Sequence, residues 1–276
     1  MGNKENNIKK PGVKTLSIHH GETFSEETGC VMPPIFSTST FKYGNKQNFD
    51  YTRSGNPNFK ILENILKSIE DSKYCTVFGS GISAVTAITS SLKSGDKILC
   101  ESNLYGCTVR MFDKIFKKFG IEALYTDFTD KESIKKIKDF QPTLIWLESP
   151  TNPLLKILDI KSICDEANKH KIPVVLDNTF TTALIQKPLE LGATLSLIST
   201  TKFINGHSDA LGGAVLTNDR EWNSKLLFSQ KALGLQPSPF DSWLITRGVK
   251  TLPLRIEQQT KSAELISKEL ENQSII

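Results

Sequence analysis

Leu195-Ser196-Leu197-Ile198-Ser199-Thr200-Thr201-Lys202 joins an apolar run of strand length to a polar turn that carries a lysine. It lies in a region, residues 74–217, where apolar runs of strand length alternate with segments of helical period. This alternation is typical of βαβ units and predicts a mostly parallel central sheet flanked by helices. We therefore expect an α/β fold with Lys202 at the carboxyl edge of the sheet, where ligands of such folds bind.

The predicted strands share short, nearly continuous apolar runs, as strands covered on both faces do. They span residues 75–78, 97–101, 122–126, 144–148, 174–177, 195–198 and 213–216. Apolar residues at helical spacing predict four helices. The spacing is set by Ile61, Leu62, Ile65, Leu66 and Ile69; by Phe112, Ile115, Phe116 and Phe119; by Ile160, Ile163, Cys164 and Ala167 after an N-cap at Asp159; and by the pattern over residues 256–270.

The composition is that of an ordinary globular protein: 276 residues, 38% hydrophobic, 23% charged, net charge +4. Charges of both signs are interspersed, and no apolar stretch approaches the roughly 20 residues that span a bilayer. The polar start, Met1 to Asn6, lacks the apolar core of a signal peptide. The five cysteines show no CxxC pairing, which favours free thiols. We expect a cytoplasmic protein with no metal, no nucleic acid and no membrane partner.

Ser199 and Thr201 stand three residues and one residue before Lys202. A lysine amine forms an imine with an aldehyde, and hydroxyl groups hydrogen-bond phosphate oxygens, so this spacing suits a phosphate-bearing aldehyde. A solvent-exposed lysine after two threonines is the plainer alternative.

Two further positions suit the same ligand. Asp177 closes a predicted strand and can pair with a protonated pyridine nitrogen, or else simply cap the following turn. The turn Phe78-Gly79-Ser80-Gly81-Ile82 leads from a strand into a helix and can aim N–H groups at an anion, although such a connection needs glycine in any case. It lacks the spacing of a nucleotide-binding loop.

Aromatic and basic residues complete the candidate site. Tyr105 follows a predicted strand and can stack on a flat ring, and Tyr51 and Arg53 can contact a phosphate. His207 lacks partners for a Ser-His-Asp arrangement, which favours a structural role.

These motifs resemble those of the Cys/Met-metabolism pyridoxal-phosphate (PLP) enzymes, which include cystathionine γ-synthase, cystathionine γ-lyase, cystathionine β-lyase and methionine γ-lyase. The lysine motif stands as Ser199-Thr200-Thr201-Lys202-Phe203-Ile204-Asn205-Gly206-His207-Ser208-Asp209, and the ring-nitrogen aspartate as Asp177 in Asp177-Asn178-Thr179-Phe180. The resemblance implies the PLP-dependent transferase fold type I, with PLP carried on Lys202 as a Schiff base.

The resemblance also implies the roles of single residues. Lys202, Tyr105 and Asp177 are expected to be catalytic. The expected cofactor contacts are backbone N–H groups of Gly81 and Ile82, hydroxyls of Ser199 and Thr201, the stacked ring of Tyr105, Asn152 beside the ring hydroxyl, and Tyr51 and Arg53 reaching the phosphate of a neighbouring subunit. Two departures, Asn58 and Ile82, stand where the family often has other residues.

The expected organisation follows from the same resemblance. Residues 1–60 form an arm that contributes to the neighbouring subunit's site, residues 61–254 a large PLP-binding domain, and residues 255–276 a connecting helix to a C-terminal domain that is apparently missing. The shared site implies a homo-oligomer, a dimer of dimers, acting on small amino-acid substrates.

Among reactions, Tyr105 with Arg110, Asp50 before Tyr51 and the stretch over residues 240–248 favour cystathionine γ-synthase, which replaces the acyl group of an O-acylhomoserine with cysteine. Cystathionine γ-lyase, β-lyase and methionine γ-lyase are alternatives, the last because of Cys107. An inactive fragment that acts only as an oligomer partner is the alternative of another class.

Overall fold

The computed structural model describes residues 11–20 and 29–273. The expectations for Met1 to Asn6 and for Ser274 to Ile276 lie outside these residues.

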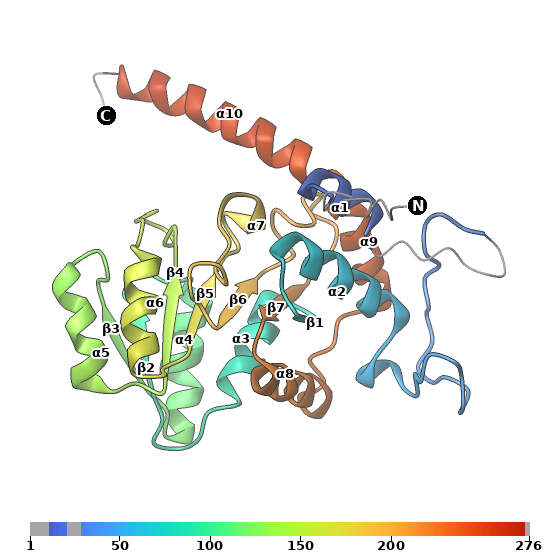
Figure 1. The fold of residues 1–276 in the computed structure, drawn as a ribbon, viewed down its shortest axis with the longest axis horizontal. Coiled ribbons are helices and arrows are strands. Elements are labelled where there is room, and N and C mark those ends of the chain that lie inside the picture. The colour runs from blue at the N-terminus through green and yellow to red at the C-terminus, as the bar shows by residue number, and fades with distance from the viewer. Residues whose placement is uncertain (1–10, 21–28, 274–276) are drawn as a thin grey trace, which may run out of the picture.

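The core of the fold is one seven-stranded sheet (Figure 1). Its spatial order is β1 (Tyr74–Phe78), β7 (Gly213–Thr217), β6 (Leu195–Ile198), β5 (Val174–Asp177), β4 (Leu144–Glu148), β2 (Lys97–Glu101) and β3 (Glu122–Thr126). Every neighbouring pair is parallel except the two that β7 makes with β1 and β6. The predicted mostly parallel sheet is confirmed, and the strand bounds agree to within one residue.

This topology brings six strand ends to one edge. β1 to β6 all point the same way, so they end together at Phe78, Glu101, Thr126, Glu148, Asp177 and Ile198. β7 runs in the opposite direction and therefore starts at this edge, with Gly213 opposite Phe78. The edge is the carboxyl edge that the sequence predicts for the site.

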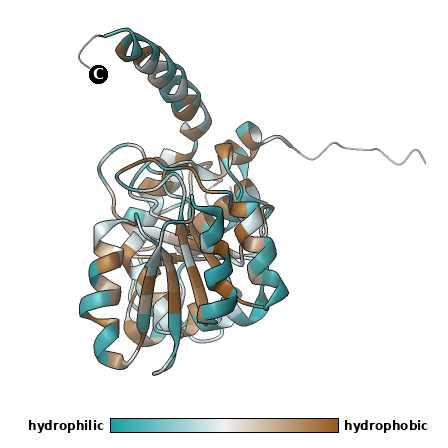
Figure 2. Ribbon diagram, turned by 90° about the vertical axis from the view of Figure 1, so that its left-hand side faces the viewer, coloured by the Kyte–Doolittle hydropathy of each residue, from teal (hydrophilic) through white to brown (hydrophobic). Residues whose placement is uncertain are grey.

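One face of the sheet is covered by α3 (Gly81–Thr89), α4 (Gly106–Lys114) and α8 (Arg220–Leu233). The opposite face is covered by α5 (Lys135–Phe140) and α6 (Ile160–Lys169) at one end, and by α2 (Pro57–Glu70) and α9 (Pro239–Val249) at the other. Figure 2 shows the hydrophobic strands between helices whose outer faces are hydrophilic. Both sheet faces are therefore buried, as the continuous apolar strands require.

Local sequence explains where the predicted helices begin. The Asn56 side chain accepts the Asn58 N–H ahead of α2, with Pro57 as its first residue, and the Asp159 side chain accepts the Ser162 N–H ahead of α6. Both are ordinary N-caps. The two predicted helices are confirmed, and so is the N-cap predicted at Asp159.

The helix predicted from Phe112 to Phe119 is interrupted. α4 ends at Lys114, and a 3-10 turn, η2 (Phe116–Phe119), follows. Phe112 and Phe116 are buried, whereas Ile115 and Phe119 are 51% and 64% exposed. A 3-10 helix has three residues per turn instead of 3.6, so the apolar side chains after this point no longer lie on the same face as those of α4.

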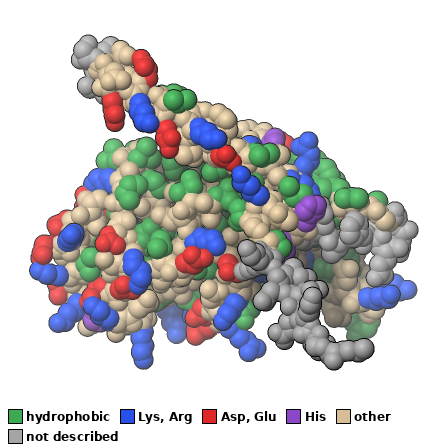
Figure 3. All heavy atoms as spheres, turned by 45° about the horizontal axis from the view of Figure 1, so that its top comes forward, with side chains coloured by type: hydrophobic (Ala, Val, Ile, Leu, Met, Phe, Trp, Pro, Cys, Tyr) green, Lys and Arg blue, Asp and Glu red, His purple; other side chains and the backbone are tan. Residues whose placement is uncertain are grey.

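The remaining elements are short except for the last. They are α1 (Val13–His19), η1 (Thr52–Ser54), η3 (Lys131–Ile134), α7 (Thr182–Ile185) and α10 (Leu252–Glu271). Only the first turns of α10 pack on the body, and the helix then projects away from it (Figure 1). Figure 3 shows acidic and basic side chains interspersed on the viewed face, and hydrophobic side chains gathered below α10.

The described residues show neither a membrane-spanning helix nor a cluster of metal ligands. No helix in that part of the chain is long and apolar enough to cross a membrane. Within the same residues, no group of three or more His, Cys, Asp or Glu could hold a metal ion. Cys75, Cys100, Cys107 and Cys164 are free thiols.

Candidate active site

The glycine turn after β1 and the serine after β6 meet closely at the carboxyl edge. A Cβ atom built on Gly81 would lie 2.9 Å from Ser199 Cβ, and one built on Gly213 would lie 2.3 Å from the Ser80 carbonyl oxygen. Real Cβ atoms do not approach so closely, so glycine is required at both positions. These glycines therefore allow close packing of the two loops. The turn after β1 lies directly beside the loop that carries Lys202.

The same turn begins α3. Ser80 is the N-cap, and its hydroxyl accepts the Ser83 N–H at 3.0 Å. The N–H groups of Gly81 and Ile82 are the first two of the helix and donate to no described residue. Free N–H groups at the positive end of a helix dipole attract an anion, so this is a suitable cradle for a phosphate.

Two buried carboxyl groups lie side by side at the ends of β4 and β5. Glu148 and Asp177 are register partners on parallel strands, and each is 9% exposed. Burial raises the pKa of Asp177, while hydrogen bonds from Thr179 oppose the rise; Thr179 N donates to Asp177 Oδ1 at 3.0 Å. Burial, together with the charge of Asp177, raises the pKa of Glu148 to about 8.

Tyr105 lies at the start of α4, next to Glu148. Its backbone N–H donates to Glu148 Oε2 at 2.7 Å, and its side chain is 43% exposed. A hydrogen bond with Cys107, and then burial, raise the pKa of Tyr105 above its usual value. Arg110 Nη2 lies 3.1 Å from Cys107 Sγ, so the guanidinium stands close to the tyrosine.

Lys202 is exposed and lies in the turn after β6. The turn is closed by the Gly206 N–H, which donates to the Lys202 carbonyl at 2.8 Å. Arg255, from α10, braces it: the guanidinium donates to the carbonyls of Phe203 at 2.7 Å and Ile204 at 3.1 Å. His207 Nδ1 lies 2.6 Å from the Asn205 carbonyl, a local contact that fits the structural role expected for it.

The two hydroxyls expected to bind phosphate differ in their surroundings. Ser199 is half-buried, and its backbone N–H donates to Thr179 Oγ1 at 2.8 Å, which links the Lys202 and Asp177 loops. Thr201 Oγ1 donates to the Gly212 carbonyl at 3.1 Å and accepts the Gly212 N–H at 3.0 Å. To donate to a phosphate, the Thr201 hydroxyl would therefore have to give up its hydrogen bond to the Gly212 carbonyl.

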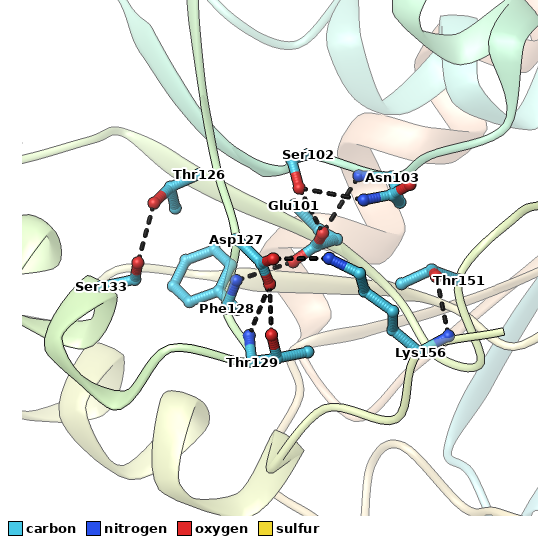
Figure 4. A network of polar contacts seen from close by, with 10 residues as sticks. All are labelled: Glu101, Ser102, Asn103, Thr126, Asp127, Phe128, Thr129, Ser133, Thr151 and Lys156. Carbon is cyan, nitrogen blue, oxygen red and sulfur yellow. Dashed lines mark hydrogen bonds and ion pairs between the residues drawn. The ribbon is translucent and has the colours of Figure 1, made fainter. Parts of the chain in front are cut away.

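Asn152 lies in the exposed loop after β4, which is fixed at both ends. The Lys156 N–H donates to Thr151 Oγ1 at 3.0 Å, and the Lys156 ammonium pairs with Asp127 after β3 (Figure 4). In the same network the buried Glu101 accepts the Phe128 N–H at 2.9 Å. These contacts position the loops of β2, β3 and β4 relative to one another.

The contacts of Tyr51 and Arg53 within this chain are with each other and with α8, and not with the loops at the carboxyl edge. Arg53 Nη1 donates to the Lys231 carbonyl on α8 at 3.0 Å, and its guanidinium lies 5.4 Å from the centre of the Tyr51 ring. A role in the site of a neighbouring subunit stays a prediction.

Sequence reasoning missed two residues that shape the site. Glu148 was predicted only as the last residue of a strand, although an acidic residue ending an apolar strand is the same signal that marks Asp177. Arg255 gives no local signal, because its partners precede it by 51 and 52 residues.

The donor set at this edge fits PLP. Free N–H groups at the start of α3 suit its phosphate, a buried carboxyl at Asp177 suits its pyridine nitrogen, and an exposed lysine follows β6. The close approach of Gly81 to Ser199 leaves room for no larger residue in the cradle.

Comparisons with known proteins agree with this chemistry. A family model described as "Cys/Met metabolism PLP-dependent enzyme" matches residues 14–276. The chain is 40% identical to a probable cystathionine gamma-synthase of Herpetosiphon aurantiacus over 93% of this chain and 82% of that protein. It is also 40% identical to a cystathionine gamma-lyase of Bacillus subtilis, over 94% and 69%. The solved cystathionine gamma synthase of Xanthomonas oryzae has a TM-score of 0.93 at 36% identity, covering 96% of this chain and 70% of that one.

Fold and site together define a PLP-dependent enzyme of fold type I. The chain belongs to the Cys/Met metabolism PLP-dependent enzymes, the trans-sulfuration family. Its cofactor is pyridoxal phosphate, and its relatives include both synthases and lyases of cystathionine.

Proposed function

We propose that this chain catalyses γ-replacement on an O-acylhomoserine, with cysteine as the incoming nucleophile and cystathionine as the product. PLP supplies an electron sink for charge that develops on the amino-acid substrate. In this proposal Asp177 keeps the ring nitrogen protonated, Gly81 and Ile82 hold the phosphate, and the Lys202 amine moves protons at the substrate carbons.

The observation that carries the choice of reaction is the cluster of Tyr105, Cys107 and Arg110 at the start of α4. Arg110 is exposed and lies within hydrogen-bond distance of Cys107, next to the tyrosine that is expected to stack on the cofactor. A replacement reaction must hold a second amino acid with its own carboxylate, and a guanidinium is suited to that contact. Solved relatives described as cystathionine gamma synthase, one in complex with cystathionine, support the same choice.

Two measurements test the proposal. The first is the absorbance spectrum of the purified chain with added PLP, followed by borohydride reduction and mass mapping, which we expect to give a covalent adduct on Lys202. The second is product analysis by mass spectrometry after incubation with O-succinylhomoserine or O-acetylhomoserine and cysteine. Cystathionine as the main product supports the synthase.

Cystathionine γ-lyase is the second candidate, because several relatives at 39–40% identity carry that name. A lyase would cleave cystathionine faster than it forms it. Faster cleavage of cystathionine than synthesis, in the same preparation, would replace the proposed reaction with elimination while leaving the cofactor site intact.

A further inference from the structure

Glu148 ends β4 and faces the same side of the sheet as Asp177. The two residues are register partners on neighbouring parallel strands, which lie about 4.8 Å apart. Both side chains are 9% exposed. Two carboxyl groups are therefore confined to one small, poorly hydrated part of the candidate site.

Glu148 also ties the start of α4 to the sheet. Its Oε2 atom accepts the Tyr105 backbone N–H at 2.7 Å. Tyr105 is the residue before the first residue of α4, and no side-chain cap bonds to that helix start. The hydrogen bond to Glu148 is thus the contact that fixes the position from which the Tyr105 ring extends.

In the described part of the chain, no cationic side chain balances the charge of this pair. Among the described residues, neither Glu148 nor Asp177 forms an ion pair, and Arg110 on α4 is directed to Cys107. The ionisable side chain whose charge acts on Glu148 is Asp177 from β5, and Tyr105 contacts Glu148 through its backbone N–H. Two adjacent buried carboxylates repel each other, so one proton is retained by the pair.

The hydrogen bonds decide which residue keeps that proton. Asp177 accepts the Thr179 N–H, and its hydrogen bonds with Thr179 favour the ionised form. Glu148 has only the Tyr105 N–H, which a protonated carboxyl group can still receive on its carbonyl oxygen. Burial and the neighbouring Asp177 raise the pKa of Glu148 to about 8.

We propose that Glu148 is a positioning residue: in its uncharged form it holds the Tyr105 backbone, and it thereby leaves Asp177 as the single ionised carboxyl group that faces the cofactor ring. The inference rests on the proposed cofactor site. It concerns Glu148, which acts through Tyr105 and Asp177 and does not itself touch the substrate.

Glu148→Gln and Glu148→Ala separate the two parts of the inference. Glutamine keeps a carbonyl oxygen for the Tyr105 N–H and cannot ionise, whereas alanine removes the acceptor. We expect the glutamine variant to stay within about threefold of the parent in the dissociation constant for PLP and in kcat. The alanine variant should lose about tenfold in both, with a smaller change in KM, as a lost hydrogen bond at a buried site implies.

Hydrogen exchange gives a readout that does not depend on activity. Mass spectrometry of the peptide over residues 103–107 should show slow exchange of the Tyr105 amide in the parent chain and in Glu148→Gln, and faster exchange in Glu148→Ala. Equal damage from glutamine and alanine would show that the charge of Glu148 is needed and would overturn the uncharged form. An alanine variant that matches the parent in cofactor affinity and exchange would overturn the positioning role.

Glu70→Gln and Glu70→Ala are the matched controls. Glu70 is a glutamate, 1% exposed, whose pKa burial raises to about 8, but it lies at the end of α2 near the amino end of β6. Its variants should leave PLP affinity and Tyr105 exchange unchanged. If the parent chain itself formed no adduct at Lys202, the proposed cofactor site would fail; if it loads PLP and Glu148→Ala behaves like Glu70→Ala, only this inference fails. An alanine variant that does not fold is replaced by Glu148→Asp, which is one methylene too short to reach Tyr105.

Discussion

At the scale of single residues, the candidate site combines few charged groups with strong burial. Asp177 and Glu148 are almost fully buried, while Lys202 and Arg110 are exposed. Burial shifts the pKa of a carboxyl group, whereas an exposed lysine or arginine side chain is accessible to a ligand.

Replacing Arg110 should weaken binding of the substrate carboxylate. Arg110→Gln is expected to raise KM for cysteine or the acylhomoserine about tenfold with a smaller effect on kcat, because one charged contact to the substrate is lost. Lys114→Gln removes the same charge one turn further along α4 and should leave KM unchanged. Steady-state kinetics for both substrates check this, and equal effects of the two variants would contradict a specific contact at Arg110.

Replacing Glu70 should flatten the dependence of stability on pH. Burial raises the pKa of Glu70 from 4.5 to about 8, so the folded chain holds a proton that the unfolded chain releases. Its stabilising effect is therefore full below about pH 4.5 and is lost as pH rises through about 8. In Glu70→Gln, the fall in free energy of unfolding between pH 5 and pH 8.5 should shrink by about 4 kcal/mol.

Urea unfolding at the two pH values measures that change. Glu63, whose pKa burial raises to about 7, contributes in the same direction, so part of the slope should remain. Glu264→Gln, which replaces an exposed glutamate on α10, is the control. An unchanged slope in Glu70→Gln would show that Glu70 ionises in the folded chain as it does in water.

At the scale of elements, the strands and capped helices could be predicted from sequence because their signals are local. A strand buried on both faces needs a continuous apolar run, and α2 and α6 carry their caps within four residues. The break between Lys114 and Phe116 could not be predicted, since the apolar spacing is the same for one helix or two.

The motifs likewise predicted which residues lie at the carboxyl edge of the sheet, but not the long-range hydrogen bonds that hold these residues in place. Lys202, Asp177 and Gly81 each follow a recognisable strand, so topology alone brings them together. The hydrogen bond from Tyr105 to Glu148 spans 43 residues, and that from Arg255 to Phe203 spans 52. Such contacts depend on how α4 and α10 pack, which no local pattern specifies.

Removing the Arg255 brace should loosen the lysine loop. Arg255→Met deprives the carbonyls of Phe203, Ile204 and Gly248 of their guanidinium partner. We expect a loss of about 2 kcal/mol in stability and weaker PLP binding, because the unpaired carbonyls lie in partly buried surroundings. Arg247→Met, an exposed arginine at the end of α9, should have neither effect.

Hydrogen exchange over residues 203–206, together with urea unfolding and PLP titration, checks the Arg255 prediction. Faster exchange with unchanged PLP affinity would mean that the brace stabilises the chain without shaping the site.

At the scale of the whole molecule, the candidate site draws on most of the chain. Residues from β1, β2, β4, β5 and β6 meet at one edge, and α10 supports it from the far end of the sequence. Within the chain, Arg53 contacts the Lys231 carbonyl on α8 and the Tyr51 ring, and neither contact is made by a loop at this edge. The prediction that they serve a neighbouring subunit therefore requires an oligomer with shared sites.

Complementation between two inactive variants tests that shared site. Lys202→Ala and Arg53→Ala should each have little activity alone. In a mixed dimer, one of the two sites combines the intact Lys202 of one chain with the intact Arg53 of the other, and random pairing makes half of the dimers mixed. Coexpression should therefore restore about a quarter of the parent activity, since only one site in each mixed dimer works. Mixed dimers isolated through two different tags should show PLP bound at Lys202 of the Arg53→Ala chain; no recovery in such purified mixed dimers would place Arg53 in the site of its own chain.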